Sequence, residues 1–134
     1  MRIKERLREL LKTERKGENI VKCDILRVLL IFNGVLWFSE LLQDLRGFYS
    51  TLGIKGELKR KSILDEIQEL EDMGLVKTDE RYKAVMTCDR GVKDIMIYLV
   101  EIDEALNAFR GDEKILNYVK KRSEILRKYF EPKR

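Results

Sequence analysis

A basic segment near the middle of the chain carries the residue types best suited to bind an anion. Lys59, Arg60 and Lys61 are consecutive, Lys55 precedes them, and the hydroxyl of Ser62 follows. Lysine and arginine side chains neutralise phosphate oxygens, and the free N–H groups at a helix N-terminus attract the same kind of ligand. A run of three basic residues is also often just a solvated helix face. The segment is therefore either an anion-binding site or a solvated face.

Catalytic and metal-binding constellations are missing from the sequence. The chain has no histidine, so neither cysteine has the partner that a cysteine nucleophile needs, and two cysteines are too few for a zinc site. Gly53 and Gly56 lack the spacing of a phosphate-binding P-loop. We therefore expect a non-enzymatic protein without a metal or a cofactor. We expect Cys23 and Cys88 to be buried free thiols, with a disulfide between them as the alternative in a hyperthermophile.

Length and composition predict one folded domain spanning residues 1–134. Charged residues make up 39% and hydrophobic residues 44%, and charges of both signs are interleaved, which indicates a globular chain. The abundance of Lys, Arg and Glu is typical of thermophiles. A net charge of +4 permits a polyanionic partner without requiring one. The N-terminal segment is charged where a signal peptide is apolar, and the longest apolar run, 28–32, is too short for a membrane span. We expect a cytoplasmic protein without membrane contact.

The segment 55–91 is the unit around which the other elements are arranged. Ile63, Ile67 and Leu70 recur at helical spacing and predict a helix over about 57–73. Gly74 ends this helix, because glycine adopts a positive φ without strain. A strand should begin at residues 75–76, turn at 79–81 and return over 82–86 as the second strand of a hairpin.

The segments before this unit predict further helices and one strand. Residues 3–16 form an amphipathic helix, expected to pack on a second subunit or on the C-terminal helices. Residues 20–33 are apolar nearly all round and predict the central buried helix. A short strand at 35–38 should pair with the hairpin, and Ser39 should cap a helix over 40–46. Residues 47–56 are expected to form a loop, with room for a short helix at 49–52, and Phe48 and Tyr49 are expected in packing contacts.

After the hairpin, apolar residues at alternating spacings of three and four predict a long helix over about 90–110. A single small domain cannot bury that much apolar surface on one helix, so we expect a subunit interface there. A final helix should follow over 113–129. The expected dimer interface comprises Leu7, Val92, Ile95, Leu99, Ile102, Leu106 and Phe109.

The segment 70–76, LEDMGLV, looks like the L-E-x-x-G-L-V run that ends the recognition helix of winged helix-turn-helix proteins. The order of the predicted elements resembles MarR-like regulators, and the longer connection at 47–56 resembles PadR-like ones. This resemblance implies a mainly α fold with a small β-hairpin wing, in which a winged helix-turn-helix is flanked by N- and C-terminal dimerisation helices. The winged-helix core would span 20–89, the N-terminal helix 1–19 and the C-terminal helices 90–134.

The resemblance also implies a function, namely sequence-specific binding of double-stranded DNA by a homodimeric transcriptional regulator that recognises an inverted repeat. Lys and Arg of the basic segment would neutralise phosphates, and Arg60 or Lys61 would reach guanine edges. Arg81 at the wing tip would touch the backbone or the minor groove. Family analogy alone places Trp37 and Tyr98 beside a small effector, and we expect both in core packing.

The alternative is a winged-helix module that binds a protein and does not contact DNA. Asp65, Glu69 and Asp72 are expected to point outward on the same helix and to repel phosphate, so only the first turns could approach DNA. An acidic or mixed-charge protein partner would fit that outer face.

Overall fold

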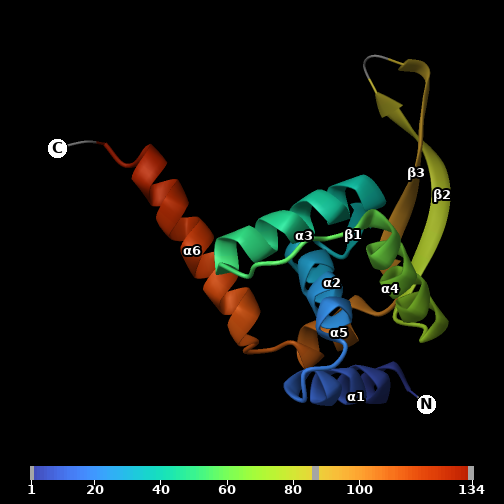
Figure 1. Ribbon diagram of the computed structural model, residues 1–134, viewed down its shortest axis with the longest axis horizontal. Helices are drawn as coiled ribbons and strands as arrows, with labels where there is room; N and C mark the ends of the chain where they lie inside the picture. Colours follow the sequence, from blue (N-terminus) through green and yellow to red (C-terminus); the bar gives the residue numbers. More distant parts are fainter. Residues whose placement is uncertain (1, 86–87, 133–134) are drawn as a thin grey trace.

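The computed structural model describes residues 2–85 and 88–132 of the chain, which form a mainly helical fold with a small three-stranded antiparallel sheet (Figure 1). The helices are α1 (Ile3–Arg15), α2 (Ile20–Ile31), α3 (Phe38–Leu52), α4 (Arg60–Asp72), α5 (Ile102–Ala108) and α6 (Glu113–Phe130). The strands are β1 (Val35–Trp37), β2 (Val76–Val85) and β3 (Cys88–Leu99). None of the helices in this described part is long and apolar enough to cross a membrane.

Helix α2 is the centre of the core, as the sequence predicted. Ile25, Leu26, Val28 and Leu29 are fully buried, and α2 packs against α1, α3, α4, α5 and β3. Burial of each such side chain contributes on the order of 1.5–3 kcal/mol. Helix α2 therefore joins α1, α3, α4, α5 and β3, whereas β1 and β2 pack on β3 and α6 packs on α3.

Helix α1 packs on α5 and α2 within the same chain. This matches one of the two expected locations, the C-terminal helices. Leu7 and Leu10 are only 2% and 3% exposed and belong to the core. The expectation that Leu7 lies at a subunit interface is therefore wrong, because its side chain is already covered by its own chain.

The sheet has the strand order β1-β3-β2, with both pairs antiparallel. The predicted small strand is confirmed, because Leu36 of β1 is paired with Ile97 of β3. Trp37 and Tyr98 lie on these neighbouring strands and are half-buried. Strands β2 and β3 continue together as a long hairpin that projects beyond the helices (Figure 1).

The predicted turn at 79–81 is wrong, because these residues lie inside β2. Tyr82 is paired with Lys93, and Arg81 with Asp94, so Arg81 is in the middle of the hairpin and not at its tip. Met86, the predicted end of the second strand, lies outside the described residues. The polar residues that suggested a turn are instead strand residues of a projecting hairpin, of which Asp79 is half-buried and Glu80 and Arg81 are exposed.

The predicted long helix over 90–110 is also wrong, because β3 and the short helix α5 occupy this segment. The nearly continuous apolar run 95–100 fits a buried central strand as well as it fits a helix. The expected helical seam does not exist. Of its members, Leu99 and Phe109 are buried, Ile95 is intermediate, and Val92, Ile102 and Leu106 are about half exposed.

Helix α3 is longer than predicted and includes most of the expected loop. It runs to Leu52 and ends at Gly53, which has a φ of 72°. Ser39 does not cap it, because the residue before the helix is Trp37, and the Ser39 hydroxyl instead donates to Asp94 at 2.5 Å. Phe48 and Tyr49 are buried, as expected for packing residues.

Glycines with a positive φ, which other residues rarely adopt, end two helices. Gly74 follows α4 with a φ of 77°, and an added Cβ would lie 2.9 Å from Nη1 of Arg6. Gly34 follows α2 with a φ of 87°, and an added Cβ would lie 3.0 Å from Cδ1 of Ile102. Both helix ends were predicted from these glycines.

Helix α6 confirms the predicted final helix and packs on α3. Tyr118 is its one buried residue, and the Tyr118 ring centroid lies 5.2 Å from that of Phe48. The C-terminal half of α6 extends away from α3 and ends at the outer edge of the molecule (Figure 1).

Candidate functional site

The first turn of α4 gathers four of the predicted site residues. Lys59 is the N-cap residue, and its side chain makes no capping hydrogen bond. Arg60, Lys61 and Ser62 follow and are exposed. Within the described residues, none of the three basic side chains, Lys59, Arg60 and Lys61, forms an ion pair with a carboxylate. The guanidinium carbon of Arg60 lies 4.8 Å from the ring centroid of buried Phe38, a cation–π contact that orients it at the start of α3.

Lys55 lies apart from this turn, in the connection 53–59 between α3 and α4. It is exposed and lines a shallow cleft of about 360 Å³ together with Arg46, Tyr49 and Ser50. The cleft leaves Lys55 open to solvent beside the end of α3. The structure therefore places Lys55 next to the basic turn along the chain, but not inside it.

Lys22 of α2 holds the acidic half of α4 against the core. Its Nζ lies 2.6 Å from a carboxylate oxygen of Glu66 and 2.6 Å from one of Glu69. Burial alone would lower the pKa of Lys22, but the hydrogen bonds and charges of Glu66 and Glu69 outweigh it and raise that pKa. Glu69 was expected to repel phosphate, but part of its negative charge is offset by Lys22, which it shares with Glu66.

Two further contacts fix the C-terminal end of α4. Arg6 of α1 donates from Nη1 to the carbonyl oxygen of Met73, which satisfies one of the free carbonyls at the end of the helix. Glu71 accepts hydrogen bonds from the backbone N–H of Thr78 at 2.7 Å and from its hydroxyl. The helix is thus attached to α1, α2 and β2, and its first turn is the end that remains exposed.

Two basic residues of the hairpin, Arg81 and Lys93, differ from those of α4 because each is already paired. Arg81 lies 2.7 Å from Asp79, and Lys93 lies 3.1 Å from Glu80. The hydrogen bond and charge of Glu80 raise the pKa of Lys93. Arg81 was predicted to touch nucleic acid at a wing tip. It lies instead in the middle of the hairpin, and Asp79 offsets part of its charge.

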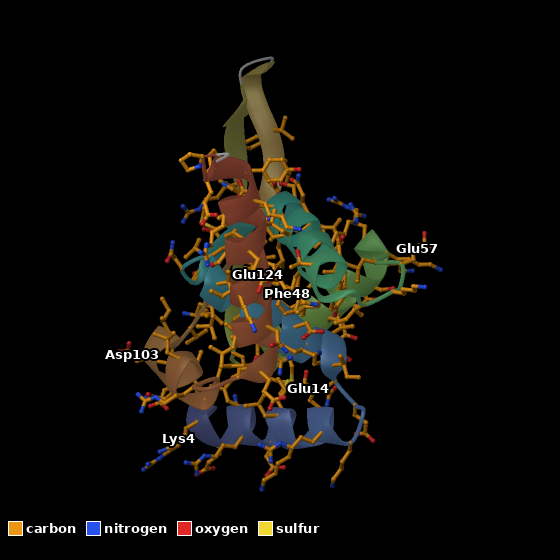
Figure 2. All side chains as sticks on the ribbon, turned by 90° about the vertical axis from the view of Figure 1, so that its left-hand side faces the viewer. Lys4, Glu14, Phe48, Glu57, Asp103 and Glu124 are labelled. Carbon is orange, nitrogen blue, oxygen red and sulfur yellow. The ribbon has the colours of Figure 1, made fainter. Side chains whose placement is uncertain are left out.

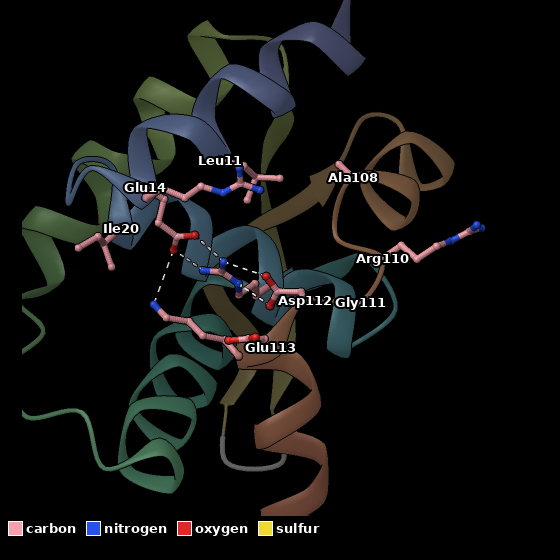
Figure 3. Close-up of a pocket in the computed structure, with 11 residues that line it drawn as sticks. Leu11, Glu14, Ile20, Ala108, Arg110, Gly111, Asp112 and Glu113 are labelled. Atoms are coloured by element: carbon pink, nitrogen blue, oxygen red, sulfur yellow. Dashed lines mark hydrogen bonds and ion pairs between the residues drawn. The ribbon is translucent and has the colours of Figure 1, made fainter.

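A second charged cluster, missed by the sequence analysis, lies in the interior around Arg27 of α2 (Figure 3). The Arg27 side chain is 4% exposed and pairs with Glu14 at the end of α1, with Asp24 one turn earlier, and with Asp112 before α6. Its Nε donates to Asp112 at 2.8 Å and its Nη2 donates to the same carboxylate at 3.0 Å. Lys114 of α6 adds an ion pair to Asp24 at 3.1 Å.

This Arg27 cluster is held by strong charge pairing in a buried place. Burial opposes the charge of Arg27, but its hydrogen bonds to Glu14 and Asp112 raise the pKa of Arg27 further above its ordinary value. The hydroxyl of Tyr49 donates to Asp24 at 2.7 Å, and burial together with that carboxylate raises the pKa of Tyr49. Every buried polar side-chain atom in the described residues has a hydrogen-bond partner, so the cluster is a satisfied structural network.

A cleft of about 650 Å³ opens beside the cluster between α1 and the start of α6. Figure 3 shows Glu14 and Asp112 converging on the same guanidinium on one wall, whereas Arg110 points away. The Arg27 charge is fully engaged by these carboxylates. The cleft therefore offers an incoming ligand no unpaired buried charge.

Cys23 packs beside the Arg27 cluster as a buried free thiol, as predicted. Its Sγ donates to the carbonyl oxygen of Leu10 at 3.7 Å. Burial, with the nearby charge of Glu14, raises the pKa of Cys23 to about 12, which suppresses the reactive thiolate at neutral pH. The side chain of Cys88 lies outside the described residues. Across the described chain, no group of three or more Cys, Asp or Glu side chains could hold a metal ion.

No family model, no curated protein and no solved structure matches the chain. The interpretation of the site therefore depends on its own geometry and charge.

Proposed function

We propose that the chain is a sequence-specific double-stranded DNA-binding protein that regulates transcription, with α4 as the helix that enters the major groove. The observation that carries this proposal is the exposed cluster of Lys59, Arg60 and Lys61 at the free N-terminal end of α4. Cations without a carboxylate partner, next to the unpaired N–H groups of a helix start, attract phosphate. Arg60 and Lys61 are long enough to reach guanine edges from this turn.

The arrangement of the neighbouring elements supports the same function. Helix α2, strand β1, helices α3 and α4, and the β2–β3 hairpin follow in the order of a winged helix-turn-helix, with sheet order β1-β3-β2. In this proposal α3 and α4 form the helix-turn-helix pair and the hairpin is the wing. The connection 53–59 is longer than the usual turn of about 3–4 residues, which displaces Lys55 from the start of α4.

The distribution of charge sets how α4 approaches DNA. Lys22 neutralises part of the acidic C-terminal half through Glu66 and Glu69, whereas Asp65 and Asp72 remain exposed. The helix therefore enters the groove by its first turns, with its acidic half tilted away from the phosphates. Asp79 offsets part of the charge of Arg81, so Arg81 contributes less affinity than the basic residues of α4.

The test is a salt titration of binding to a mixed-sequence DNA duplex. We expect the affinity of the wild type to fall steeply with salt concentration, because phosphate contacts release counterions. Replacement of Lys59, Arg60 and Lys61 by Glu should abolish this binding. The matched control replaces Lys4, Arg8 and Lys12 of α1 by Glu and changes the net charge by the same amount. Helix α1 lies at the C-terminal end of α4, away from the basic first turn (Figure 1). Selection of preferred sequences from a random duplex pool then tests specificity.

Each outcome separates DNA binding from the alternative. Loss of binding in the α4 variant with retention in the α1 control supports the proposed interface. Equal loss in both variants would indicate attraction by net charge alone and would contradict it. No binding by the wild type at low salt would favour a protein-binding module, whose surface would be the acidic outer half of α4.

A further inference from the structure

Helix α6 carries the positive surplus of the chain. Six of its 18 residues are Lys or Arg and two are Glu, so the helix has a net charge of +4. The whole chain has 28 basic and 24 acidic residues, which is also a net charge of +4. The charges outside α6 therefore cancel, and the excess that attracts a polyanionic surface lies on this one helix.

One side of α6 is an exposed apolar stripe, called the α6 stripe below. It consists of four residues that are 49–80% exposed, namely Leu116, Val119, Leu126 and Phe130. The helix packs on the fold by another side, because at roughly 100° per residue the stripe does not include Tyr118, whose ring packs on Phe48 of α3. The stripe is therefore open to a surface outside the described chain.

Cationic side chains border the α6 stripe on both sides. At roughly 100° per residue, Arg122 lies along one side of the stripe, whereas Lys120 and Arg127 lie along the other. All three are exposed. Among the described residues, Lys120 and Arg122 form no ion pair, and Arg127 pairs with exposed Glu131 at 2.9 Å. The charge of the helix is thus concentrated beside its exposed apolar surface.

We propose that α6 binds the surface of an anionic lipid bilayer, with the α6 stripe among the acyl chains and its cationic borders at the lipid phosphates. Helices that lie in a bilayer interface combine an apolar face with Lys and Arg side chains beside it. The aliphatic stems of these side chains lie along apolar surface while their charged ends stay at the headgroups. Tyr129 and Phe130 add exposed rings at the end of the helix, and aromatic side chains favour this depth.

Binding of this kind requires no membrane-spanning segment. None of the helices in the described residues is long and apolar enough to cross a membrane, and the expectation of no membrane contact rested on the same lack of a long apolar run. A helix that lies flat on a bilayer needs only one apolar side. The C-terminal half of α6 extends beyond α3 (Figure 1), and Figure 2 shows α6 along one side of the molecule. Helix α6 therefore lies at the periphery, where a flat surface can reach it.

The arrangement of charge favours a lipid surface over a second α6 helix as the partner of the stripe. Two facing stripes would bring Lys120, Arg122 and Arg127 of one copy close to the same cations of the other, and like charges across an interface are unfavourable. A bilayer with anionic lipids presents phosphates on both sides of the stripe at once, so each border cation strengthens binding. Lipid binding is also separate from the proposed DNA binding, because α6 and α4 lie on opposite sides of the molecule (Figure 1).

The test is sedimentation of the chain with vesicles of phosphatidylcholine and phosphatidylserine in the absence of DNA. We expect the wild type to bind these vesicles, and to bind vesicles of phosphatidylcholine alone at least about tenfold more weakly. The α6 charge variant carries Lys120→Gln, Arg122→Gln and Arg127→Gln. It should bind the mixed vesicles on the order of a hundredfold more weakly, because each cation beside an anionic bilayer contributes about fivefold.

Two control variants locate the contact. The matched control carries Lys4→Gln, Arg8→Gln and Lys12→Gln, which removes the same charge from α1, and it should bind vesicles like the wild type. Figure 2 shows Lys4 on α1, below α6. The α4 variant of the DNA-binding test, with Glu at residues 59–61, should lose DNA but keep the vesicles.

Insertion of the stripe is measured separately from the attraction of charge. The stripe variant, Val119→Ser with Phe130→Ser, keeps the net charge and loses two exposed apolar side chains, so its binding should weaken at least about tenfold. The Phe130→Trp variant adds a second tryptophan to the single one of the wild type, Trp37. Its fluorescence should shift to the blue and be quenched by brominated lipids when vesicles are added, whereas the wild-type fluorescence should not change.

Circular dichroism establishes that each variant is folded before its binding is interpreted. A wild type that does not sediment with the mixed vesicles overturns the proposal and favours an acidic protein surface as the occupant of the stripe. Equal losses in the α6 charge variant and in the α1 control would mean attraction by net charge alone and would also overturn it.

Two further outcomes contradict insertion of the stripe. Unchanged binding by the stripe variant, without a blue shift in Phe130→Trp, would place the protein on the headgroups only. A wild-type dimer in the absence of lipid that the stripe variant dissociates would assign the stripe to a second copy of the chain. All α6 variants should bind a DNA duplex like the wild type, so failure here is distinguishable from failure of the proposed DNA binding.

Discussion

The two charged clusters, one of basic residues at the start of α4 and one of paired residues around Arg27, are built in opposite ways. Lys59, Arg60 and Lys61 are exposed and have no carboxylate partner within the described chain. Arg27 is buried and is held by three carboxylates. Burial of a charge is costly unless it is paired, whereas an exposed cation is solvated by water. The same residue types therefore stabilise the fold in one place and remain available to an anion in the other.

The largest effect predicted by this comparison is on stability, at Arg27. Replacement by Met keeps much of the side-chain volume but leaves Glu14, Asp24 and Asp112 without their shared cation. We expect the free energy of unfolding to fall by about 3–5 kcal/mol, as for other broken buried pairs. Urea denaturation at pH 7 measures it.

The control for this prediction is Arg15→Met, because Arg15 lines the same cleft but is exposed. Its effect should remain within about 0.5 kcal/mol. If Arg27→Met costs less than 1 kcal/mol, the Arg27 cluster is not a stabilising network and the contrast between the two clusters fails.

A smaller loss of stability is expected from Tyr49→Phe, which removes a single hydrogen bond to Asp24 in the same cluster. Hydrogen bonds to charged groups contribute about 1.5–3 kcal/mol. The matched control is Tyr118→Phe, since the Tyr118 ring also packs on Phe48 but no hydrogen bond of its hydroxyl is seen among the described residues. Equal losses in the two variants would show that ring packing, and not the bond to Asp24, is what the substitution disturbs. Urea denaturation again gives both values.

The first turn of α4 and the Arg27 cluster also differ in how well the sequence predicts them. The helical spacing of Ile63, Ile67 and Leu70 and the stop at Gly74 are local, so α4 and its basic start were placed correctly. The cluster joins residues 14, 24, 27, 112 and 114, which no spacing rule connects. The available signal was three charged residues, Lys22, Asp24 and Arg27, in a helix that is otherwise apolar.

The same distinction between local and distant contacts explains the two errors in the fold predicted from the sequence. The segment 95–100 has no local feature that separates a helix from a strand, and the pairing of Ile97 with Leu36 and Thr78 decides the outcome. Gly91, with a φ of 74°, was a local sign against a helix start. Asp79 and Arg81 suggested a turn because they are polar, but exposed hairpin strands need polar residues as well. Contacts between distant segments therefore overrode local patterns in both places.

A third prediction uses pH to probe the buried cluster through Cys23. The pKa of Cys23 is raised from 9.0 to about 12 in the folded protein, so the unfolded chain loses the thiol proton first. The resulting stability is complete below pH 9 and is lost as pH rises toward 12. Wild type should lose about 1.4 kcal/mol more than Cys23→Ala for each pH unit in this window.

Urea denaturation of both proteins at pH 8 and pH 10 measures this difference in slope. The Cys23→Ala variant controls for Lys22 and Tyr49, whose raised pKa values cause losses in the same alkaline direction in both proteins. Parallel pH profiles for the two proteins would mean that the thiol is not desolvated beside Glu14 and Arg27.

The smallest effect on stability is expected at the exposed cluster, where Lys61→Gln removes one unpaired cation. Because this side chain is solvated and has no carboxylate partner in the described structure, the free energy of unfolding should change by less than about 0.5 kcal/mol. In DNA binding, by contrast, the slope of log affinity against log salt should fall by about one, the value for one lost phosphate contact. Lys12→Gln on α1 is the control, since Lys12 is also exposed and pairs only weakly with Glu9 at 3.8 Å. An unchanged salt slope in Lys61→Gln would place the phosphate contacts elsewhere, and a large loss of stability would mean that Lys61 is structural, which would remove the difference between the two clusters.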